Sequence, residues 1–504
     1  MSELAHSKGD NSEGYIMSID AGTTNVNCTL YDRLGSAAGF GQRTVSQFFP
    51  NPGWVEQDPT EILEAVADSV RDATTDAGCR EKDIVAMGIA NQRETAIVWD
   101  RRTGRPLHNA IGWQCRRTSE ICDGIREEHG EWIRERTGLK VDAYFSATKL
   151  KWMLDNVPGM KISAERGDAL FGTVDTWLLW KLTGGKVHAT DVSNASRTMM
   201  FDIGRMRWDS EILEVLGIPE AMLPDVKQSS DDFGTVSSVG SRIPISGVMG
   251  DQQAALFGQA CFSKGDSKCT YGTGGFMLTN TGDKPAVSRN GLLTTVAWNI
   301  GGRTTYALEG SIYSTGAAID WMKDIGLIGT LAQTEDLAKA VPDTGGCYLV
   351  PAFSGLGAPY WDQYARGAIV GITRGTTKAH MVRAALEASA YQVDAVIEAM
   401  EEDSGTEVGM LKIDGGMSVN DFTAQFQADI SDIEVVRPRN IETTSMGAAY
   451  MAGLSAGFWK STDEISEIWK AERSFRPSMA IGTRSALRRG WEDAVNRART
   501  GHAI

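Results

Sequence analysis

Three aspartates stand directly after short apolar segments of this chain, at points where a buried strand would end. Asp20 follows the segment 15–19, Asp251 follows the segment 243–250, and Asp414 follows the segment 410–413. Ligands of α/β proteins bind at the carboxyl ends of sheet strands, and a carboxylate in a closing cleft can take a proton from a hydroxyl group. The pattern therefore indicates a site built at strand ends, with Asp251 as the candidate general base.

Small turns rich in glycine and threonine accompany these aspartates. They lie at residues 22–24, 272–275 and 415–416. Backbone N–H groups and threonine hydroxyls in such turns can reach phosphate oxygens, because glycine leaves no Cβ in the way. One such turn alone is more often an ordinary hairpin turn, but three of them favour phosphate binding. The chain has no GxxxxGK[ST] sequence, which excludes a P-loop and places any nucleotide between two domains.

Length and composition exclude several classes of protein. A chain of 504 residues is too long for one ordinary core, so we expect two domains of roughly 250 residues. With 50 Lys and Arg against 65 Asp and Glu, the net charge of −15 disfavours nucleic acid as a partner. No apolar run reaches the roughly 18 residues that span a bilayer. Residues 1–13 are polar, and we expect them to form a flexible tail. The seven cysteines include no CxxC pair, which favours a reducing, cytoplasmic compartment.

Strand-like and helix-like segments alternate along the chain, which predicts an α/β fold. Strand patterns at 15–19, 25–30 and 37–45 are followed much later by a similar set at 267–278 and 297–306, which predicts a diverged duplication divided near Gly250. Helical spacing of apolar residues predicts helices over 60–75, behind a start signal at 58–61, and over 378–400.

Long strings of this sequence resemble the FGGY family of carbohydrate kinases, which belong to the actin-like ATPase-domain superfamily. The resemblance covers the chain from about Tyr15 to about Trp459. The strings that match the family signatures are 144–156, 367–372 and 380–387. Other strings are similar to the members that phosphorylate glycerol, namely 52–59, 91–95, 250–258, 437–438 and 442–444.

The resemblance implies two duplicated actin-like (ribonuclease H-like) α/β domains with a nucleotide and substrate cleft between them. Residues 14–254 would form the domain that binds polyol and phosphate, and residues 255–504 the domain that binds the nucleotide. It also implies a homodimer or homotetramer, with no nucleic-acid partner and no stable membrane insertion.

The implied reaction transfers the γ-phosphoryl group of ATP to a terminal hydroxyl of glycerol, giving sn-glycerol 3-phosphate. Asp251 would accept the hydroxyl proton, and Asp20 would hold Mg²⁺, mainly through water. A polyol needs hydrogen-bond partners for its hydroxyls and an apolar wall for its carbons. The residues implied for glycerol are Arg93, Glu94, Trp113, Tyr144, Asp251, Gln252 and Phe276. Those implied for the nucleotide are Thr23, Thr24, Asn25, Thr273, Gly316, Asp320, Gly416 and Asn420.

The chain departs from the family pattern at four positions. Similar enzymes usually have Gln, Arg, Asp and Gln where this chain has Ala21, Asn27, Cys115 and Asp320. None of the polyol positions is changed, so we expect the departures to affect nucleotide use. Gly240 and Arg242 match positions of an inhibitory fructose 1,6-bisphosphate site in some bacterial members, but the loop before them is short, so we do not predict that regulation.

Other functions remain open at this point. A kinase for erythritol, dihydroxyacetone or xylulose would keep the phosphate turns and Asp251 but change the set Arg93, Trp113, Tyr144 and Phe276. A non-enzymatic actin-like protein would keep only the nucleotide turns, and a simple nucleotide hydrolase would need no acceptor.

Overall fold

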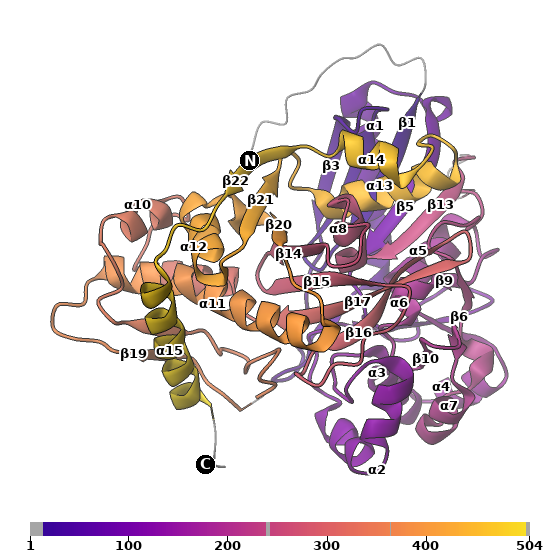
Figure 1. Ribbon diagram of the computed structural model, residues 1–504. Helices are drawn as coiled ribbons and strands as arrows, with labels where there is room; N and C mark the ends of the chain where they lie inside the picture. Colours follow the sequence, from indigo (N-terminus) through magenta and orange to yellow (C-terminus); the bar gives the residue numbers. More distant parts are fainter. Residues whose placement is uncertain (1–13, 238–241, 363, 500–504) are drawn as a thin grey trace.

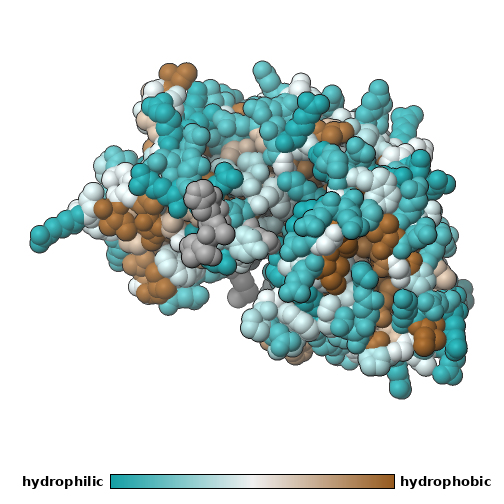
Figure 2. Space-filling view, turned by 90° about the horizontal axis from the view of Figure 1, so that it is seen from below, coloured by the Kyte–Doolittle hydropathy of each residue, from teal (hydrophilic) through white to brown (hydrophobic). Residues whose placement is uncertain are grey.

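The computed structural model describes residues 14–237, 242–362 and 364–499. Its two main sheets lie side by side, each covered by helices (Figure 1). The predicted tail 1–13 and Gly240 lie outside the described residues. On the face seen in Figure 2, hydrophilic residues predominate and hydrophobic ones gather in separate patches.

The first sheet has the strand order β13-β5-β1-β2-β3. Strands β1, β2 and β3 form an antiparallel meander, while β5 and β13 run parallel to β1. The three strands predicted at the start of the chain are therefore confirmed. Their bounds are β1 Tyr15–Ala21, β2 Asn25–Tyr31, β3 Ala37–Thr44, β5 Ile84–Asn91 and β13 Ile245–Gly250.

The second sheet repeats this plan. Its order is β16-β17-β15-β14-β20-β21-β22, and the inner run β17-β15-β14-β20-β21 has the same sequence of antiparallel and parallel pairings as β3-β2-β1-β5-β13. The predicted duplication is thus visible as two copies of one topology. The bounds are β14 Ser267–Tyr271, β15 Gly275–Gly282, β16 Leu293–Ile300, β17 Arg303–Ile312, β20 Met410–Asp414, β21 Glu434–Pro438 and β22 Ala471–Phe475.

Two helices cover opposite faces of the first sheet. Helix α1 (Pro59–Ala77) begins where the Asp58 side chain accepts from the backbone N–H of Thr60. It packs so closely that a Cβ on Gly41 would lie 2.2 Å from the Ser69 carbonyl oxygen. On the other face, α13 (Thr443–Ser455) approaches β5 so closely that a Cβ on Gly88 would lie 2.0 Å from a helix carbonyl oxygen. Side chains alternate along β1, so Asp20 lies on the α13 face, together with Ser18.

The second predicted helix is also confirmed. Helix α11 (Lys378–Ser404) covers the second sheet and is buried along most of its length. The predicted domain boundary after residue 254 falls inside α8 (Asp251–Gly258), which directly follows β13. That boundary stays a prediction.

A long insertion between β5 and β13 carries most of the residues implied for the polyol. Its elements are β6 Ile97–Asp100, β7 Ala110–Ile111, α2 Ser119–Thr137, α3 Ser146–Asn156, α4 Met160–Glu165, β8 Ala169–Gly172, α5 Val174–Leu182, β9 Ala189–Asp191, α6 Val192–Ala195, β10 Phe201–Asp202, β11 Arg207–Trp208, α7 Ser210–Leu216, η2 Glu220–Met222 and β12 Asp225–Lys227. Strand β4 (Glu56–Gln57), which precedes the insertion, pairs with β7.

The remaining elements flank the two sheets. They are η1 Glu81–Asp83, α9 Gly316–Asp324, α10 Gln333–Lys339, β18 Tyr348–Val350, β19 Ala368–Val370, η3 Gly416–Val419, α12 Asp421–Ser431, α14 Thr462–Ile468 and α15 Ile481–Ala498. Across the part of the chain that the structure describes, no helix combines the length and apolar character needed to cross a membrane. All seven cysteines have free thiols, six of them buried and Cys79 half-buried.

Candidate active site

The strand ends of the first sheet meet at one edge, as the sequence pattern predicts. Gly250 of β13 and Ala21 of β1 both pair with Asn91 of β5. Because these three strands are parallel, the residues that follow them come out side by side. Asp251, the first residue of α8, therefore lies next to the segment that continues from β5 into Arg93.

Asp20 occupies a strongly perturbed position at this edge. Burial raises its pKa well above the ordinary value, and the negative charges of Asp251 and Glu442 raise it further. A nearby cation would stabilise a buried carboxylate that feels other negative charges. The position of Asp20 therefore fits a role in holding Mg²⁺.

Arg93 is held by two carboxylates at once. Its Nε lies 3.1 Å from Oδ1 of Asp251, whose side chain is 26% exposed. Its two terminal nitrogens contact the carboxylate oxygens of Glu309 at 2.5 and 3.0 Å. Arg93 thus fixes the position of the candidate base while its own orientation is set by a residue from β17.

A second arginine completes a buried charge cluster, formed by Arg93, Glu94, Arg197 and Glu309. Arg197 donates to Glu94 at 2.7 Å and to Glu309 at 2.9 Å. Burial alone would raise the pKa of Glu309, but Arg197 and Arg93 outweigh it and lower that pKa to about 2. Burial outweighs the arginines at Glu94, whose pKa is raised. Two positive and two negative charges balance inside the cluster.

Sequence reasoning missed Glu309 and Arg197. The one local signal was a carboxylate directly after the apolar pair Ala307 and Leu308 of β17, both of which are buried. A charged residue is almost never fully buried unless it is paired, so Glu309 could have been marked as a residue in need of a partner. Nothing in the sequence around Arg197 marks it in this way.

Three aromatic residues implied for the polyol form a wall beside the buried charge cluster. The ring centroid of Trp113 lies 5.6 Å from that of Tyr144 and 6.2 Å from that of Phe276, both in edge-to-face geometry. The indole N–H of Trp113 donates to the Thr23 hydroxyl at 2.9 Å. This contact ties the aromatic wall to the first glycine and threonine turn.

The second turn meets two elements of the nucleotide side. The backbone N–H of Gly316 donates to the carbonyl oxygen of Gly272 at 3.0 Å, and that of Ala317 donates to Thr273 at 3.0 Å. A Cβ on Gly316 would lie 2.5 Å from the Gly272 carbonyl and 3.2 Å from the Met417 sulfur, so only glycine allows this approach. These contacts bring together the turn 272–275, the start of α9, and η3. Gly416, the first residue of η3, is exposed.

Other predicted nucleotide residues are partly used by the scaffold. Asn420 caps α12 by accepting from the Thr423 N–H at 3.0 Å. The Asn25 side chain accepts from the hydroxyl of Thr44 on β3 at 3.2 Å. Thr24 is exposed beside this pair. The Asn25 side chain is thus partly occupied by a contact within the sheet, while Thr24 is open to solvent.

The four departures from the family pattern have different surroundings. Ala21 is buried in the core and Asn27 accepts a hydrogen bond from β3. Cys115 is buried, and its sulfur accepts from Arg117 at 3.1 Å. Asp320 is exposed on α9, the helix that begins at Gly316. Of the four departures, Asp320 is therefore the most exposed to solvent.

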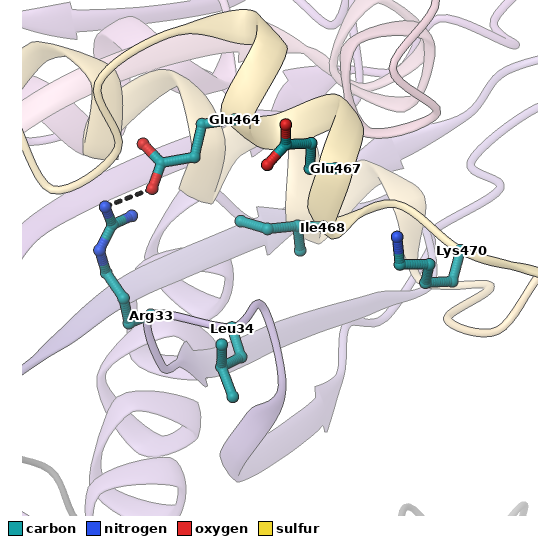
Figure 3. Close-up of a pocket in the computed structure, with 6 residues that line it drawn as sticks. All are labelled: Arg33, Leu34, Glu464, Glu467, Ile468 and Lys470. Atoms are coloured by element: carbon teal, nitrogen blue, oxygen red, sulfur yellow. Dashed lines mark ion pairs between the residues drawn. The ribbon is translucent and has the colours of Figure 1, made fainter.

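A cavity of about 530 Å³ lies elsewhere, between the β2–β3 turn and α14 (Figure 3). Arg33 forms an ion pair with Glu464 at its edge, and Leu34 and Ile468 supply its apolar floor. None of the residues predicted for the site lines this cavity. Its contacts hold α14 against the first sheet.

Comparison with known families agrees with this geometry. Residues 15–258 match the model for the N-terminal domain of the FGGY family of carbohydrate kinases, and residues 267–456 match the model for its C-terminal domain. The chain belongs to the FGGY family of carbohydrate kinases. The resemblance predicted from the sequence is therefore confirmed.

Individual relatives of this FGGY kinase are similar over nearly its whole length. It is 55% identical to glycerol kinase 2 of Thermotoga maritima over 488 residues, which cover 96% of this chain and 98% of the relative. The structure of Plasmodium falciparum glycerol kinase with ADP matches with a TM-score of 0.90 at 36% identity, covering 97% of this chain and 99% of that one. A ligand-bound xylulose kinase from Lactobacillus acidophilus matches with a TM-score of 0.86 at 22% identity, covering 96% and 97% of the two chains. That last match shows the shared fold alone.

Proposed function

We propose that this FGGY kinase transfers the γ-phosphoryl group of ATP to a terminal hydroxyl of glycerol, giving sn-glycerol 3-phosphate and ADP. The observation that carries the proposal is the contact of Arg93 Nε with Asp251 beside the wall of Trp113 and Phe276. A carboxylate for the acceptor hydroxyl and an apolar wall for its carbons are both what a small polyol requires. The 55% identity to a glycerol kinase supports the choice of acceptor.

In this mechanism the protein residues orient the acceptor and take its proton. Asp251 accepts the proton of the attacking hydroxyl, and Glu94 accepts from a second hydroxyl. Trp113 and Phe276 pack against the carbon chain and exclude water, which would otherwise compete as an acceptor. The turns that contain Thr24 and Thr273 hold the phosphates of ATP through backbone N–H and hydroxyl groups.

We also propose that Mg²⁺ accompanies ATP and rests on Asp20. Among the described residues, no three His, Cys, Asp or Glu side chains converge as a metal site, so water and phosphate oxygens would complete the shell. Mg²⁺ neutralises charge on the transferring phosphoryl group. From the family resemblance we further propose a cytoplasmic homodimer or homotetramer, which light scattering on the purified protein would test.

A coupled assay of ADP release tests the proposed reaction. Glycerol should stimulate ADP release strongly, while xylulose, erythritol and dihydroxyacetone at equal concentration should do so less. Faster phosphorylation of one of these would move the chain to another branch of the family. Equal ADP release with and without any acceptor would instead indicate a nucleotide hydrolase.

Replacing Asp20 with Ala should weaken the productive Mg²⁺–ATP complex and slow transfer, while glycerol binding alone changes little. The physical reason is that the metal contacts the nucleotide and not the polyol. Calorimetry with glycerol in the absence of nucleotide separates the two roles. A large loss of glycerol affinity would mean that Asp20 belongs to the acceptor site.

Propane-1,2-diol should be a poor acceptor compared with glycerol. It lacks one hydroxyl and would leave a buried polar group of the site without its partner, which costs about 1 to 3 kcal/mol, or roughly fivefold to more than hundredfold in kcat/KM. Direct competition between the two acceptors measures this ratio. Equal use of both would contradict a site in which every glycerol hydroxyl is bound.

A further inference from the structure

Lys268 is a fully buried lysine beside the proposed acceptor site. It lies in β14 with 0% of its surface exposed. Its Nζ donates to Oε1 of Gln252 at 2.5 Å and to the hydroxyl of Thr270 at 2.8 Å. Burial lowers its pKa, and the negative charge of Asp414 opposes that change. The two oxygen partners explain how an ammonium group is kept in the interior.

The contact with Lys268 decides which way the Gln252 amide faces. An ammonium group can only donate hydrogen bonds, and an amide has one accepting oxygen and one donating NH₂ group. Oε1 must therefore face Lys268, and Nε2 faces away from it. Gln252 directly follows the candidate base Asp251, and its backbone N–H donates to Oδ1 of Asp251 at 2.7 Å.

Apart from the Tyr144 hydroxyl, the other polar residues implied for the acceptor offer few free hydrogen-bond donors. Asp251 and Glu94 are carboxylates. They can accept hydrogen bonds from the hydroxyl groups of the substrate but have no hydrogen to donate to its oxygens. Arg93 has five N–H groups, and its nitrogens already contact neighbouring side chains. Those neighbours are Asp251 at Nε, Glu309 at both terminal nitrogens, Gln253 at 3.2 Å and Tyr144 at 3.5 Å.

We propose that Lys268 is a positioning residue that holds the Gln252 amide as a hydrogen-bond donor to an oxygen of the acceptor. The proposal deepens the proposed function and rests on it. Lys268 also lies on the strand that continues into the turn 272–275. It therefore fixes the acceptor-binding amide relative to the strand that carries the second phosphate turn.

The neighbouring strand offers a matched control. Lys412 of β20 stands directly opposite Lys268 in the parallel register. Its Nζ donates to the carbonyl oxygens of Gln259 at 2.7 Å and Ala260 at 3.3 Å. A Lys412→Met variant removes an ammonium group of the same kind from the same sheet without touching Gln252.

The test is a double-mutant cycle in the full chain. Lys268→Met, Gln252→Ala, the double variant and Lys412→Met are assayed for kcat and for KM of glycerol and ATP. Lys268→Met should raise the glycerol KM about tenfold with little change in kcat or in the KM for ATP. Lys412→Met should leave the glycerol KM near that of the wild type. In the Gln252→Ala background, Lys268→Met should add less than about twofold, because its effect passes through the amide.

A second variant keeps the proposal testable if Lys268→Met folds poorly. Gln252→Glu retains an oxygen for Lys268 but offers no N–H to the acceptor, so the glycerol KM should rise as it does for Gln252→Ala. A wild-type KM for Gln252→Glu would overturn the proposal, and so would independent effects of Lys268→Met and Gln252→Ala. If the wild-type chain prefers another polyol, the proposed function fails, and the same cycle with that polyol still tests Lys268 separately.

Discussion

Replacing Asp251 with Asn should leave a folded protein that binds nucleotide but transfers phosphoryl groups about 10³-fold more slowly. An amide has nearly the shape of the carboxylate but cannot accept the hydroxyl proton. The side chain is 26% exposed, so its neutralisation leaves Arg93 with Glu309 as a buried partner and the fold intact. Steady-state kcat, nucleotide binding by calorimetry and the melting temperature measure the three expectations.

An exposed aspartate provides the control for this change. Asp283 is exposed and follows the end of β15 opposite to Gly275 and Phe276, so Asp283→Asn should behave as the wild type in all three measurements. An Asp251→Asn variant that keeps more than about a tenth of the wild-type kcat would refute its role as general base. A variant that loses nucleotide binding as strongly as transfer would point to a structural role instead.

Replacing Glu309 with Ala should both destabilise the protein and impair glycerol phosphorylation. Both Arg93 and Arg197 would lose a carboxylate partner inside the protein, and breaking a buried ion pair in this way costs about 3 to 5 kcal/mol. We expect the melting temperature to fall by roughly 10 °C. Because Glu309 sets the orientation of Arg93, kcat/KM for glycerol should fall even at temperatures where the variant is folded.

A glutamate on the surface gives the matched comparison. Glu211 also pairs with an arginine, Arg136, at 3.1 Å, but its side chain is 61% exposed. Such a surface ion pair contributes about 0 to 1 kcal/mol, so Glu211→Ala should melt within a few degrees of the wild type. If Glu309→Ala melted as high as Glu211→Ala, the buried charge cluster would not have the energetic role that we assign to it.

The local pattern of the sequence was enough to place the elements that frame the site. Apolar segments followed by an aspartate predicted that Asp20, Asp251 and Asp414 stand at strand ends, and all three do. The aspartate before Pro59 predicted the start of α1. These features depend on residues within a few positions of one another, through strand alternation and helix capping. The wider set of site residues came from the family resemblance and not from such local patterns.

Only the tertiary structure decided which distant residues complete the site. Arg93 and Glu309 are 216 positions apart in the sequence. The Ser18 hydroxyl donates to the carbonyl oxygen of Ser445 on α13, which is 427 positions away. The sequence around one residue of such a pair does not identify its partner. A buried charge is stabilised by a residue that can come from a distant part of the chain. The same holds for Lys268, whose neighbours on β14 give no sign of the amide that it contacts. The sequence by itself determined the strands that end at the three aspartates and the two long helices α1 and α11. The packing of distant segments determined which charges and which amide surround those aspartates.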